Sequence, residues 1–559
     1  MPKILINEID QTFPGTPGAY SNFAVLITGF EKGIKNPTVK PDSNNVYEFT
    51  STQAFVDTIG CLPPKMEKTT GNGSITFKHY GNQMAYELLK LGYPVIYKSL
   101  GNLAEDYTTT KDVVDTITSE DLWAPFKDKA SYDFRFVTHG LLSSSRDSLE
   151  TNQEYQEATR KKAILEEALG VLNSIKKDVD DLEELANQEA NTDFERESEL
   201  LARYNEVADN YEGFIEKNNT PYATYAEAVI GVTTKLAEVI VTIENIECSG
   251  LTSGDINKVN GHIANLAKYV VVENPTNKTV YGRGDCIALI ELDEKTYTTK
   301  KGSINRPEDL IIQGIKGMSG TITAENGTYC ALTVPSVVYK MSENTEYDDN
   351  KVFPGAFHYL ACFLNSIRLG FAEWYAVAGY TRGVSSYVID HTTVKLGEIA
   401  INALEPRYII DQEVDPQFAC NVIANFRGSY YLWGNRTAHQ LGAKGNAETG
   451  DLVARHFLNI RHLCTTIKKQ LYIACRTFTF DPNSDTLWVN FCNAIRPTLD
   501  AMKADQGIRD YKILKITDNV PKATLKAKIR IIPIEAVEDF DLEIFLEDSF
   551  GETAAAVIE

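Results

Sequence analysis

The chain has 559 residues, of which 43% are hydrophobic and 24% are charged. A chain of this length supplies roughly two to four domains with sizeable cores, and the composition is that of an ordinary globular protein. The formal net charge is −22. This charge argues against a nucleic-acid partner, because binding to phosphate backbones requires clustered Lys and Arg.

Two further properties of the sequence indicate in which cellular compartment the protein is expected. No apolar run is long enough to span a bilayer, and Met1 to Asp10 lacks a basic start followed by an apolar stretch. We therefore expect no signal peptide, no membrane insertion, and a protein that stays in the cytoplasm where it is made. The nine cysteines contain no C-x-x-C pair, which favours reduced thiols packed as small apolar groups over zinc ligands.

Residues 145–280 are expected to form a helical insertion. Residues 151–220 hold 18 Asp and Glu against 8 Lys and Arg, a net charge of −10. Apolar residues recur every three or four positions in two stretches, which predicts two antiparallel helices. The first stretch contains Leu165, Leu169, Leu172, Ile175, Val179, Leu182 and Ala186, and the second contains Leu201, Tyr204, Val207, Tyr211 and Phe214.

A third helix is expected to begin at Thr220-Pro221 and to run to about Glu247, with Thr as the N-cap and Pro at the first helical position. A helix from Lys161 to Leu185 would be about 38 Å long, so the insertion could project well away from the core. It is either a solvated addition without a further task or an acidic decoration that contacts neighbours or spaces subunits.

Motifs of catalysis were sought and none is complete. Gly317-Met318-Ser319-Gly320 falls short of the G-x-S-x-G elbow, and Gly442-Ala443-Lys444-Gly445 is not a phosphate loop. His456 and His462 are six residues apart, which is the wrong spacing for two ligands on one helix face. His79 and His439 stand alone and suit a structural role. We therefore expect no enzyme, with no catalytic residue, metal or cofactor.

The most patterned stretch runs from Gly428 to Tyr511. Tyr430 to Trp433 suits a buried strand that ends in a turn at Gly434-Asn435. An amphipathic helix is predicted from Asp451 to Tyr472, and a strand from Thr477 to Phe480. A second helix then opens near Asp485 and ends at Gly507, and Pro497 should kink or break it. Its apolar face contains Leu487, Trp488, Phe491, Ile495, Leu499 and Met502.

This order of elements resembles the C-terminal domain of contractile tail sheath proteins. That family has a strand ending in a Trp-Gly-x-Arg-Thr turn, a helix with Asn-x-Arg, a Phe-x-Pro-Asn turn, and a helix with an early Trp. The matching residues here are Trp433, Gly434, Arg436, Thr437, Asn459, Arg461, Phe480, Pro482, Asn483 and Trp488. Each motif alone is weak, whereas their order and spacing are fairly specific. For Arg436 a structural role that organises local carbonyls is favoured over ligand binding.

The resemblance continues upstream of this stretch. Trp374 to Val384 looks like the family's strand and glycine-rich link into the C-terminal domain, and Ser21 to Gly29 looks like its first core strand. Tyr80 to Tyr97 resembles the first helix and the strand after it. Tyr132 to Thr138 and Asp285 to Ile290 resemble two further central strands. The likeness covers most of the chain except roughly residues 145–280.

The fold class expected from the resemblance is mixed α/β with several domains. It implies a central domain of subtilisin-like topology without catalysis, an α/β C-terminal sheath domain, an inserted helical hairpin and extended terminal arms. The expected division is residues 1–20 as N-terminal arm, 21–144 and 281–394 as the two parts of the central domain, 145–280 as the insertion, 395–530 as the C-terminal sheath domain, and 531–559 as C-terminal arm.

The function implied is that of a structural protein. Copies of such subunits stack as rings, which we expect to be hexameric, around an inner tail tube protein, and they contract to drive the tube through a cell envelope. The resemblance implies further partners in a baseplate and in tail terminator or neck proteins. It places the protein in a virion tail that is assembled in the cytoplasm of a host bacterium.

The family couples its subunits by terminal arms that add strands to the sheets of neighbouring protomers. Both ends of this chain alternate in the way such a strand requires. At the N-terminus these positions are Ile4, Ile6 and Ile9, with Pro14 to Gly18 as a hinge. Near the C-terminus Leu525, Ala527, Ile529 and Ile531 form a first run, and Phe540, Leu542, Ile544 and Leu546 form a second that is the stronger donor. Either run could instead pair within its own chain.

The family's helix after the Phe-x-Pro-Asn turn lies near the tube. The matching charged positions are Asp485, Arg496, Asp500 and Lys503, which are otherwise solvated helix residues. Charge pairs suit a contact that must hold and then release.

Two other functions remain open at this point. One is the sheath of a headless phage-derived particle or of a secretion-type contractile machine, although having core and arms on one chain favours a phage tail or phage-derived particle. The other is a serine hydrolase of subtilisin-like topology, which would require an Asp, a His and a Ser to meet beside an oxyanion hole.

Overall fold

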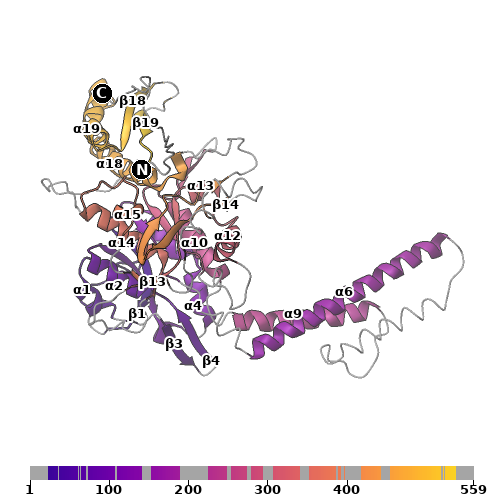
Figure 1. The fold of residues 1–559 in the computed structure, drawn as a ribbon. Coiled ribbons are helices and arrows are strands. Elements are labelled where there is room, and N and C mark those ends of the chain that lie inside the picture. The colour runs from indigo at the N-terminus through magenta and orange to yellow at the C-terminus, as the bar shows by residue number, and fades with distance from the viewer. Residues whose placement is uncertain are drawn as a thin grey trace, which may run out of the picture.

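A computed structural model gives the fold of the chain (Figure 1). It describes residues 23–34, 37–60, 62, 65–70, 73–107, 110–141, 153–188, 225–247, 253–273, 278–293, 306–339, 352–384, 388–391, 396, 404, 417–441, 454–517, 520 and 523–536.

The core of the chain is an eight-stranded mixed sheet. Its spatial order is β16 (Ser429–Trp433), β15 (Asn421–Phe426), β10 (Cys330–Val334), β9 (Ile287–Ile290), β6 (Phe136–Val137), β1 (Val25–Glu31), β5 (Val95–Asn102) and β2 (Val46–Phe49). The six inner strands are parallel. The edge strands β2 and β16 run antiparallel to their neighbours.

Helices cover both faces of this sheet, so the central unit has three layers. On strand β1, Val25 and Ile27 belong to the core on one face and Leu26 to the core on the other, as the alternation of a strand requires. The first face is covered by α1 (Thr52–Thr58), α2 (Gly81–Leu91) and α14 (Gly355–Arg368). The second is covered by α4 (Thr110–Ile117), η2 (Glu120–Lys127), α10 (Ser253–Ala267) and α12 (Pro307–Gly317).

The expected mixed α/β class is confirmed, and the elements expected upstream are largely found. β1, α2 with β5, β6 and β9 lie in or next to the stretches that were predicted. The strand expected at Trp374 is wrong: that stretch forms turns and the short helix α15 (Gly379–Arg382).

Smaller elements surround the sheet. They are β3 (Lys65–Thr70) with β4 (Gly73–Lys78), β7 (Val270–Glu273) with β8 (Lys278–Tyr281), β14 (Gln417–Phe418) with β17 (Gln440–Leu441), and β11 (Val337–Tyr339) between β12 (Val352–Phe353) and β13 (Val388–His391). The remaining short helices are α3 (Leu103–Asp106), α13 (Ala324–Gly327) and η3 (Ala454–His456). Searched over the described residues, the helices include none with the length and apolar character of a membrane span.

The outer edge of β16 is partly covered. Tyr431 forms an antiparallel bridge with Val384, and the N–H of Leu432 donates to the carbonyl of Gly383 at 2.7 Å. The opposite edge of the sheet is β2, a strand of only four residues. Both edges of the central sheet are therefore short or capped.

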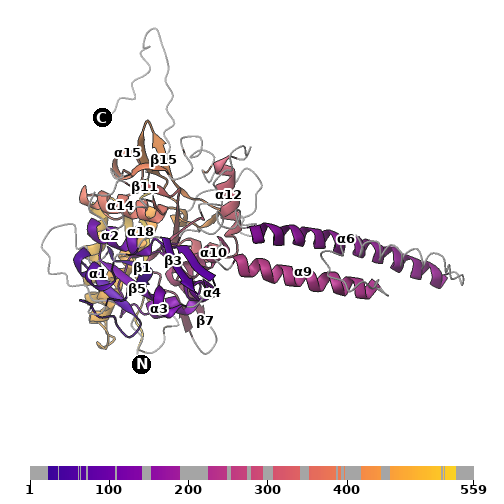
Figure 2. The ribbon, with the colours of Figure 1, turned by 90° about the horizontal axis from the view of Figure 1, so that it is seen from below.

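Two long helices of the insertion project from this body (Figures 1 and 2). α6 (Gln153–Gln188) packs along α9 (Tyr225–Glu247), with Leu165, Leu172 and Val232 buried. The pair therefore joins the first predicted helix to the third, while the predicted second helix, residues 201–214, lies outside the described residues. The 36 residues of α6 correspond to a helix about 54 Å long.

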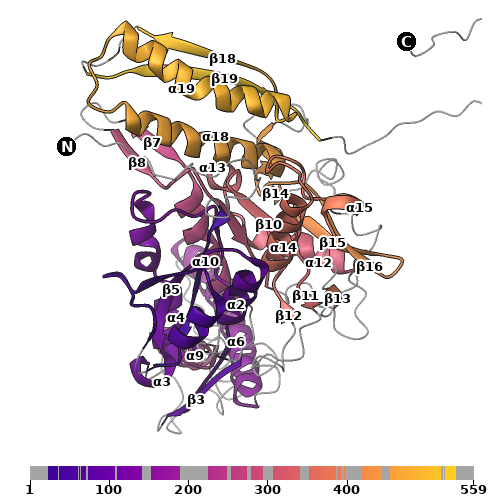
Figure 3. The ribbon, with the colours of Figure 1, turned by 90° about the vertical axis from the view of Figure 1, so that its left-hand side faces the viewer.

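The C-terminal unit contains two helices and a hairpin, stacked on one end of the central body (Figure 3). α18 (Leu458–Thr477) packs on α19 (Asp485–Ala504), and α19 packs on the hairpin of β18 (Ile508–Ile516) and β19 (Lys526–Pro533). The two predicted helices are confirmed, and Pro497 lies inside α19 without ending it. The strand predicted from Thr477 to Phe480 is wrong, because α18 continues to Thr477 and a turn follows.

Two of the expected domain limits fall inside structural units. β15 and β16 follow residue 395 but belong to the central sheet, beside β10. β19 continues to Pro533, so residues 531–533 lie in the hairpin and not in an arm. The first alternating run, from Leu525 to Ile531, thus meets its partner β18 within the chain.

Candidate functional site at the junction of the C-terminal unit

Helix α18 lies across the amino ends of the central strands and carries basic side chains into them. Lys468 Nζ donates to the carbonyl of Gly284, 2.9 Å away, just before β9. Lys469 Nζ donates to the carbonyl of Phe134, 3.1 Å away, just before β6, and forms an ion pair with Asp133. Arg461 Nη2 lies 2.5 Å from Thr328 Oγ1, just before β10. These side chains donate hydrogen bonds to polar groups at the amino ends of the strands, which the sheet itself leaves without partners.

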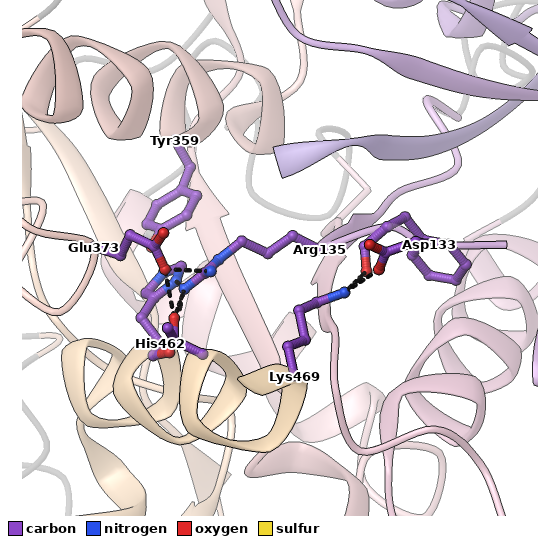
Figure 4. Close-up of polar contacts among 8 residues, drawn as sticks. Asp133, Arg135, Tyr359, Glu373, His462 and Lys469 are labelled. Atoms are coloured by element: carbon purple, nitrogen blue, oxygen red, sulfur yellow. Dashed lines mark hydrogen bonds and ion pairs between the residues drawn. The ribbon is translucent and has the colours of Figure 1, made fainter. Parts of the chain in front are cut away.

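Arg135 forms the centre of this junction (Figure 4). Its guanidinium is 1% exposed and lies 2.6 Å from Glu373 Oε2. Its other terminal nitrogen donates to the carbonyl of His462 at 3.2 Å and to Thr466 Oγ1 at 3.1 Å. Thr466 in turn donates to Glu373. One buried cation thus joins the start of β6, the segment after α14 and helix α18.

His462 completes the network in its neutral form. Burial, together with the charges of Arg135 and Arg461, lowers the pKa of His462 well below its ordinary value. Because Arg135 only donates, Nδ1 of His462, 3.3 Å from Arg135 Nη2, is the acceptor. The proton is then on Nε2, which donates to the hydroxyl of Tyr359 at 2.5 Å. The imidazole ring also stacks on Phe363, with centroids 4.8 Å apart.

A second buried cation lies in the segment just before β9. Arg283 is fully buried and forms an ion pair with Asp285, with Nε 3.0 Å from Oδ1. It also donates to the carbonyl of Phe126 at 2.9 Å and lies over the ring of Phe134. Burial alone would raise the pKa of Asp285, but Arg283, Lys469 and Lys129 lower it below its ordinary value. The carboxylate is therefore ionised at neutral pH.

The turn predicted at Trp433 to Thr437 makes a second set of contacts between the central sheet and helix α18. Gly434 has φ +144°, and a Cβ there would lie 3.0 Å from the Cα of Asn421. The side chain of Asn421 accepts from the N–H of Arg436 at 2.8 Å and donates to the carbonyls of Arg436 and Leu332, each at 3.0 Å. Glycine is required at position 434 because a side chain there would push the turn away from Asn421. The Asn421 side chain must lie this close to hydrogen-bond both the turn and β10.

This turn also holds the beginning of α18. Asn435 Oδ1 accepts from the N–H of Asn459 at 3.0 Å, and the carbonyl of Asn435 accepts from the N–H of Leu458 at 3.0 Å. The Asn435 side chain also donates to Asn459 Oδ1 at 2.8 Å. The residue that precedes the helix, Phe457, has no side-chain cap of its own. Asn435 therefore supplies from a distant segment what an N-cap residue normally supplies.

The remaining signature residues are divided between two places. Arg436 is buried, with its guanidinium 4.9 Å from the centre of the Phe457 ring, and Thr437 Oγ1 donates to the carbonyl of Arg455 at 2.6 Å. The structure thus brings Gly434, Arg436 and Thr437 together with Asn459 and Arg461. Trp433 points elsewhere and packs against Phe426 and Tyr380.

The signature residues after α18 lie at the far end of the unit. Phe480 is 84% exposed with φ +72°, and Asn483 Nδ2 donates to the carbonyl of Thr524 at 3.4 Å. Trp488 stacks on Phe491 at 5.8 Å. The turn with Pro482 therefore connects the two helices and touches the loop that leads into β19, and it does not join the Arg135 network.

The charged residues of α19 differ in their partners. Asp485 forms an ion pair with Lys515 at 2.8 Å, Lys503 with Asp510 at 3.0 Å, and Asp500 accepts from the hydroxyl of Tyr511 at 2.6 Å. These three residues thus contact the hairpin of their own chain. The side chain of Arg496 is exposed and makes no ion pair or hydrogen bond with the described residues.

The two terminal arms are predicted on residues that the structure does not describe. Ile4, Ile6 and Ile9, and likewise Phe540, Leu542, Ile544 and Leu546, lie outside the described residues.

Sequence reasoning missed the residues that hold the junction together. These residues are Arg135, Glu373, Asn421 and His462. Arg135 and His462 lie 327 positions apart in the sequence, so no local pattern links them. One signal was present: Arg135 interrupts the apolar run from Phe134 to Val137, and a charged residue in a buried strand requires a partner.

Among the described residues, several thiol and imidazole groups are deeply buried, and burial shifts their pKa values away from the neutral range. Burial raises the pKa of the Cys286 thiol to about 12, and lowers the pKa of His79 to about 3. Ser319 lies in a turn after α12 and bridges to Ile322. Within the described ranges, no three His, Cys, Asp or Glu side chains lie close enough together to hold a metal ion.

Comparison with solved structures finds similar chains. One is in the cryo-EM structure of the anti-feeding prophage (AFP) baseplate, with 10% identity, a TM-score of 0.48, and coverage of 98% of this chain and 99% of that chain. Another is in the contracted-state PVC sheath complex of an extracellular contractile injection system, with 10% identity, a TM-score of 0.44, and coverage of 98% of each chain. No family model and no curated protein matches the sequence.

Arg135 provides a direct test of the junction. Replacing Arg135 with Met should lower the free energy of unfolding by about 3 kcal/mol, because it leaves Glu373 and His462 without their buried partner. The matched control is Arg306→Met, which removes an exposed pair with Asp309 and should cost less than about 1 kcal/mol. Urea unfolding of the purified protein measures both values, and equal losses would contradict the assigned role.

The buried histidines predict a pH dependence of stability. Burial lowers the pKa of His139 to about 4 and that of His79 to about 3, and the pKa of His462 is also lowered. These three residues therefore bind protons only in the unfolded chain between about pH 5 and 6.5. Glu291 opposes them, because burial raises its pKa and it binds a proton in the folded state.

Together these four groups take up about two more protons in the unfolded chain, so their contribution to the free energy of unfolding should fall by roughly 2.7 kcal/mol per pH unit as the pH drops from 6 to 5. His462→Gln should reduce this slope by about one proton, and Glu291→Gln should increase it by about one. Urea unfolding at several pH values measures the slope. A flat profile, or two variants with the same slope as the parent, would contradict the assignment.

Proposed function

We propose that this chain is the subunit of a contractile tail sheath. The observation that carries the proposal is the ordered set of motifs from Trp433 to Trp488. Its first half, Gly434 to Thr437 with Asn459 and Arg461, forms one hydrogen-bonded junction that fixes α18 to the central sheet. A structural role without catalysis is in keeping with motifs whose polar groups bind one another.

The hairpin of β18 and β19 supports a role in polymerisation. Among the described residues no third strand joins it, so both of its outer edges have free backbone groups. One face packs on α19 and α18 through Tyr511, Ile513, Ala527 and Ile529. Such an edge accepts an additional strand, and we propose that the arms at residues 1–20 and 534–559 of neighbouring copies supply it.

In this proposal many copies stack as rings, hexameric in the simplest case, around an inner tube protein. Baseplate and terminator or neck proteins close the two ends, and the assembly forms the tail of a virion made in a bacterial cytoplasm. The central unit is proposed to have subtilisin-like topology without its chemistry. The projecting pair of α6 and α9 is proposed as an acidic, coiled-coil-like decoration of the outer surface.

Contraction requires no catalytic group, because the energy is the difference between two packings of the same subunits. A difference of a few kcal/mol per subunit, summed over about a hundred coupled copies, makes the change effectively one-way. The buried ion pairs at the junction support movement of each subunit as a rigid body.

The sheath of a headless phage-derived particle, or of a secretion-type machine, is the second candidate, since the same subunit architecture serves each. A serine hydrolase is the weakest candidate. Ser319, the serine of the near-motif, follows a helix and bridges to Ile322. Specific labelling of one serine by a serine-reactive probe would revive that candidate.

Negative-stain microscopy of the purified protein tests the proposal. Long striated tubes are expected, because free hairpin edges and donor arms should drive polymerisation. Deleting residues 1–12, or residues 536–559, should abolish full-length tubes while leaving folded subunits, as judged by circular dichroism. Discrete monomers under all conditions would contradict the sheath function, and tubes built from the truncated chains would contradict the arm model.

Arg496 gives a separate prediction for the contact with the inner tube. Arg496→Glu should weaken co-sedimentation with the tube protein at low salt, because this exposed charge is not engaged within the described part of its own chain. Lys503→Glu should also weaken it, with an additional loss of the pair to Asp510. Lys316→Glu, on the exposed face of α12, is the control. Unchanged co-sedimentation of the Arg496 variant would contradict the proposed contact.

A further inference from the structure

A buried lysine lies beside helix α18 without an acceptor for its protons. Lys129 follows η2 and is only 9% exposed. Its ammonium lies 5.6 Å from the centre of the Tyr269 ring and 5.8 Å from the centre of the Tyr472 ring. Among the described residues it forms no hydrogen bond and no ion pair, so its three N–H donors are uncommitted. A buried ammonium in this state is unfavourable.

The hydroxyl of Tyr472 is a second uncommitted donor. Tyr472 belongs to α18, and its hydroxyl is shielded from solvent and has no hydrogen-bond partner in the described part of the chain. Burial raises the pKa of Tyr472 to about 12, so the hydroxyl keeps its proton at neutral pH. Because the ammonium of Lys129 lies over the same ring, one small acceptor can reach both groups.

The carboxylates nearby are engaged by other donors. Both oxygens of Asp285 accept from Arg283, and Asp133 forms an ion pair with Lys469. Asp128 accepts from an N–H and a hydroxyl within its own turn. None of these three carboxylates therefore supplies the acceptor that Lys129 and Tyr472 lack.

The surrounding charges favour an anion at this place. The charges that act most strongly on Lys129 and Tyr472, counted together with Lys129 itself, are four cations and two carboxylates. The cations are Lys129, Arg283, Lys468 and Arg476, and the carboxylates are Asp128 and Asp285. This local excess of positive charge occurs in a chain whose net charge is −22. Burial lowers the pKa of Lys129, and an anion beside the ammonium would offset that effect.

Lys468 adds a further donor beside Tyr269. Its ammonium donates to the carbonyl of Gly284 and to the hydroxyl of Tyr329, which leaves one of its three protons. It lies 5.6 Å from the centre of the Tyr269 ring, as Lys129 does. Tyr269 is 41% exposed, so solvent reaches this ring. A small ion can therefore approach, whereas the burial of Lys129 excludes a large ligand.

We propose that a small oxyanion of the phosphate class binds between the ammonium of Lys129 and the hydroxyl of Tyr472, with Lys468 adding positive charge beside Tyr269. The oxygens of such an ion point in several directions, which suits donors that come from separate elements. Lys129 belongs to the central unit and Tyr472 to α18, so the bound ion joins these two units at a place distinct from Arg135 and Asn421. The inference is independent of the proposed sheath function.

Binding of inorganic phosphate to the full-length protein tests the site. Phosphate is titrated in a Tris chloride buffer at neutral pH, against potassium chloride of equal ionic strength. It should raise the melting temperature by at least about 2 °C at saturation, because it binds the folded chain and not the unfolded one. Isothermal titration calorimetry should show saturable binding of one ion per chain.

Two variants and a control locate the binding. Lys129→Met should abolish the saturable shift, and in chloride alone it should melt no lower than the parent, because it removes a buried charge that has no partner. Tyr472→Phe should weaken phosphate binding about tenfold, since it deletes one hydrogen bond to a charged group. Lys316→Met removes an exposed lysine of α12 and should keep the shift of the parent.

The contrary outcomes are distinct. Equal shifts in the parent and in Lys129→Met would assign the effect to exclusion of phosphate from the protein surface and overturn the site. Neither a shift nor heat of binding in the parent would also overturn it and leave water as the partner of both donors. If Lys129→Met does not fold, Tyr472→Phe decides, and an affinity equal to that of the parent would reject the site. None of these results depends on whether the chain forms tubes.

Discussion

Arg135 extends from the start of a central strand into helix α18, and its charge has to be neutralised there because it is removed from water. Glu373, Thr466 and the carbonyl of His462 do so, from elements that are otherwise separate in the fold. A buried charge of this kind stabilises the folded state little compared with a well-packed apolar core, but it tolerates no partner being withdrawn. The position of the C-terminal helices therefore depends on all of these partners remaining in contact with Arg135.

The consequence is a chain in which the central sheet and helix α18 are joined rigidly, while the hairpin lies apart from that junction. The turn at Gly434 and the basic residues of α18 fasten the C-terminal unit at two places, so strain applied to the hairpin is transmitted to the central sheet. The hairpin itself lies outside both fastenings, beyond α19. The outer face and the outer edges of the hairpin therefore take no part in the buried ion pairs.

The sequence predicted those features that depend on local pattern. The periodic apolar residues of α18 and α19 located both helices, and the turn at Trp433 to Thr437 was recognised because glycine and the residues around it form a local motif. The strand predicted at Thr477 failed because alternation over four residues also fits a helix end. The pairing of α6 with α9 was missed because periodicity gives a helix its face and not its partner. Arg135 and Asn421 act across hundreds of residues, where spacing carries no information.

The edges of the central sheet and of the β18–β19 hairpin differ in how readily they can pair with a strand of another chain. On the central sheet β2 is only four residues long and β16 is bridged by Val384, so neither edge offers a long template for a stray chain. The hairpin leaves both edges open among the described residues. Within the described part of the chain, the long central sheet is therefore protected against uncontrolled β-pairing at both of its edges, which reduces the risk that its apolar strands template an aggregate.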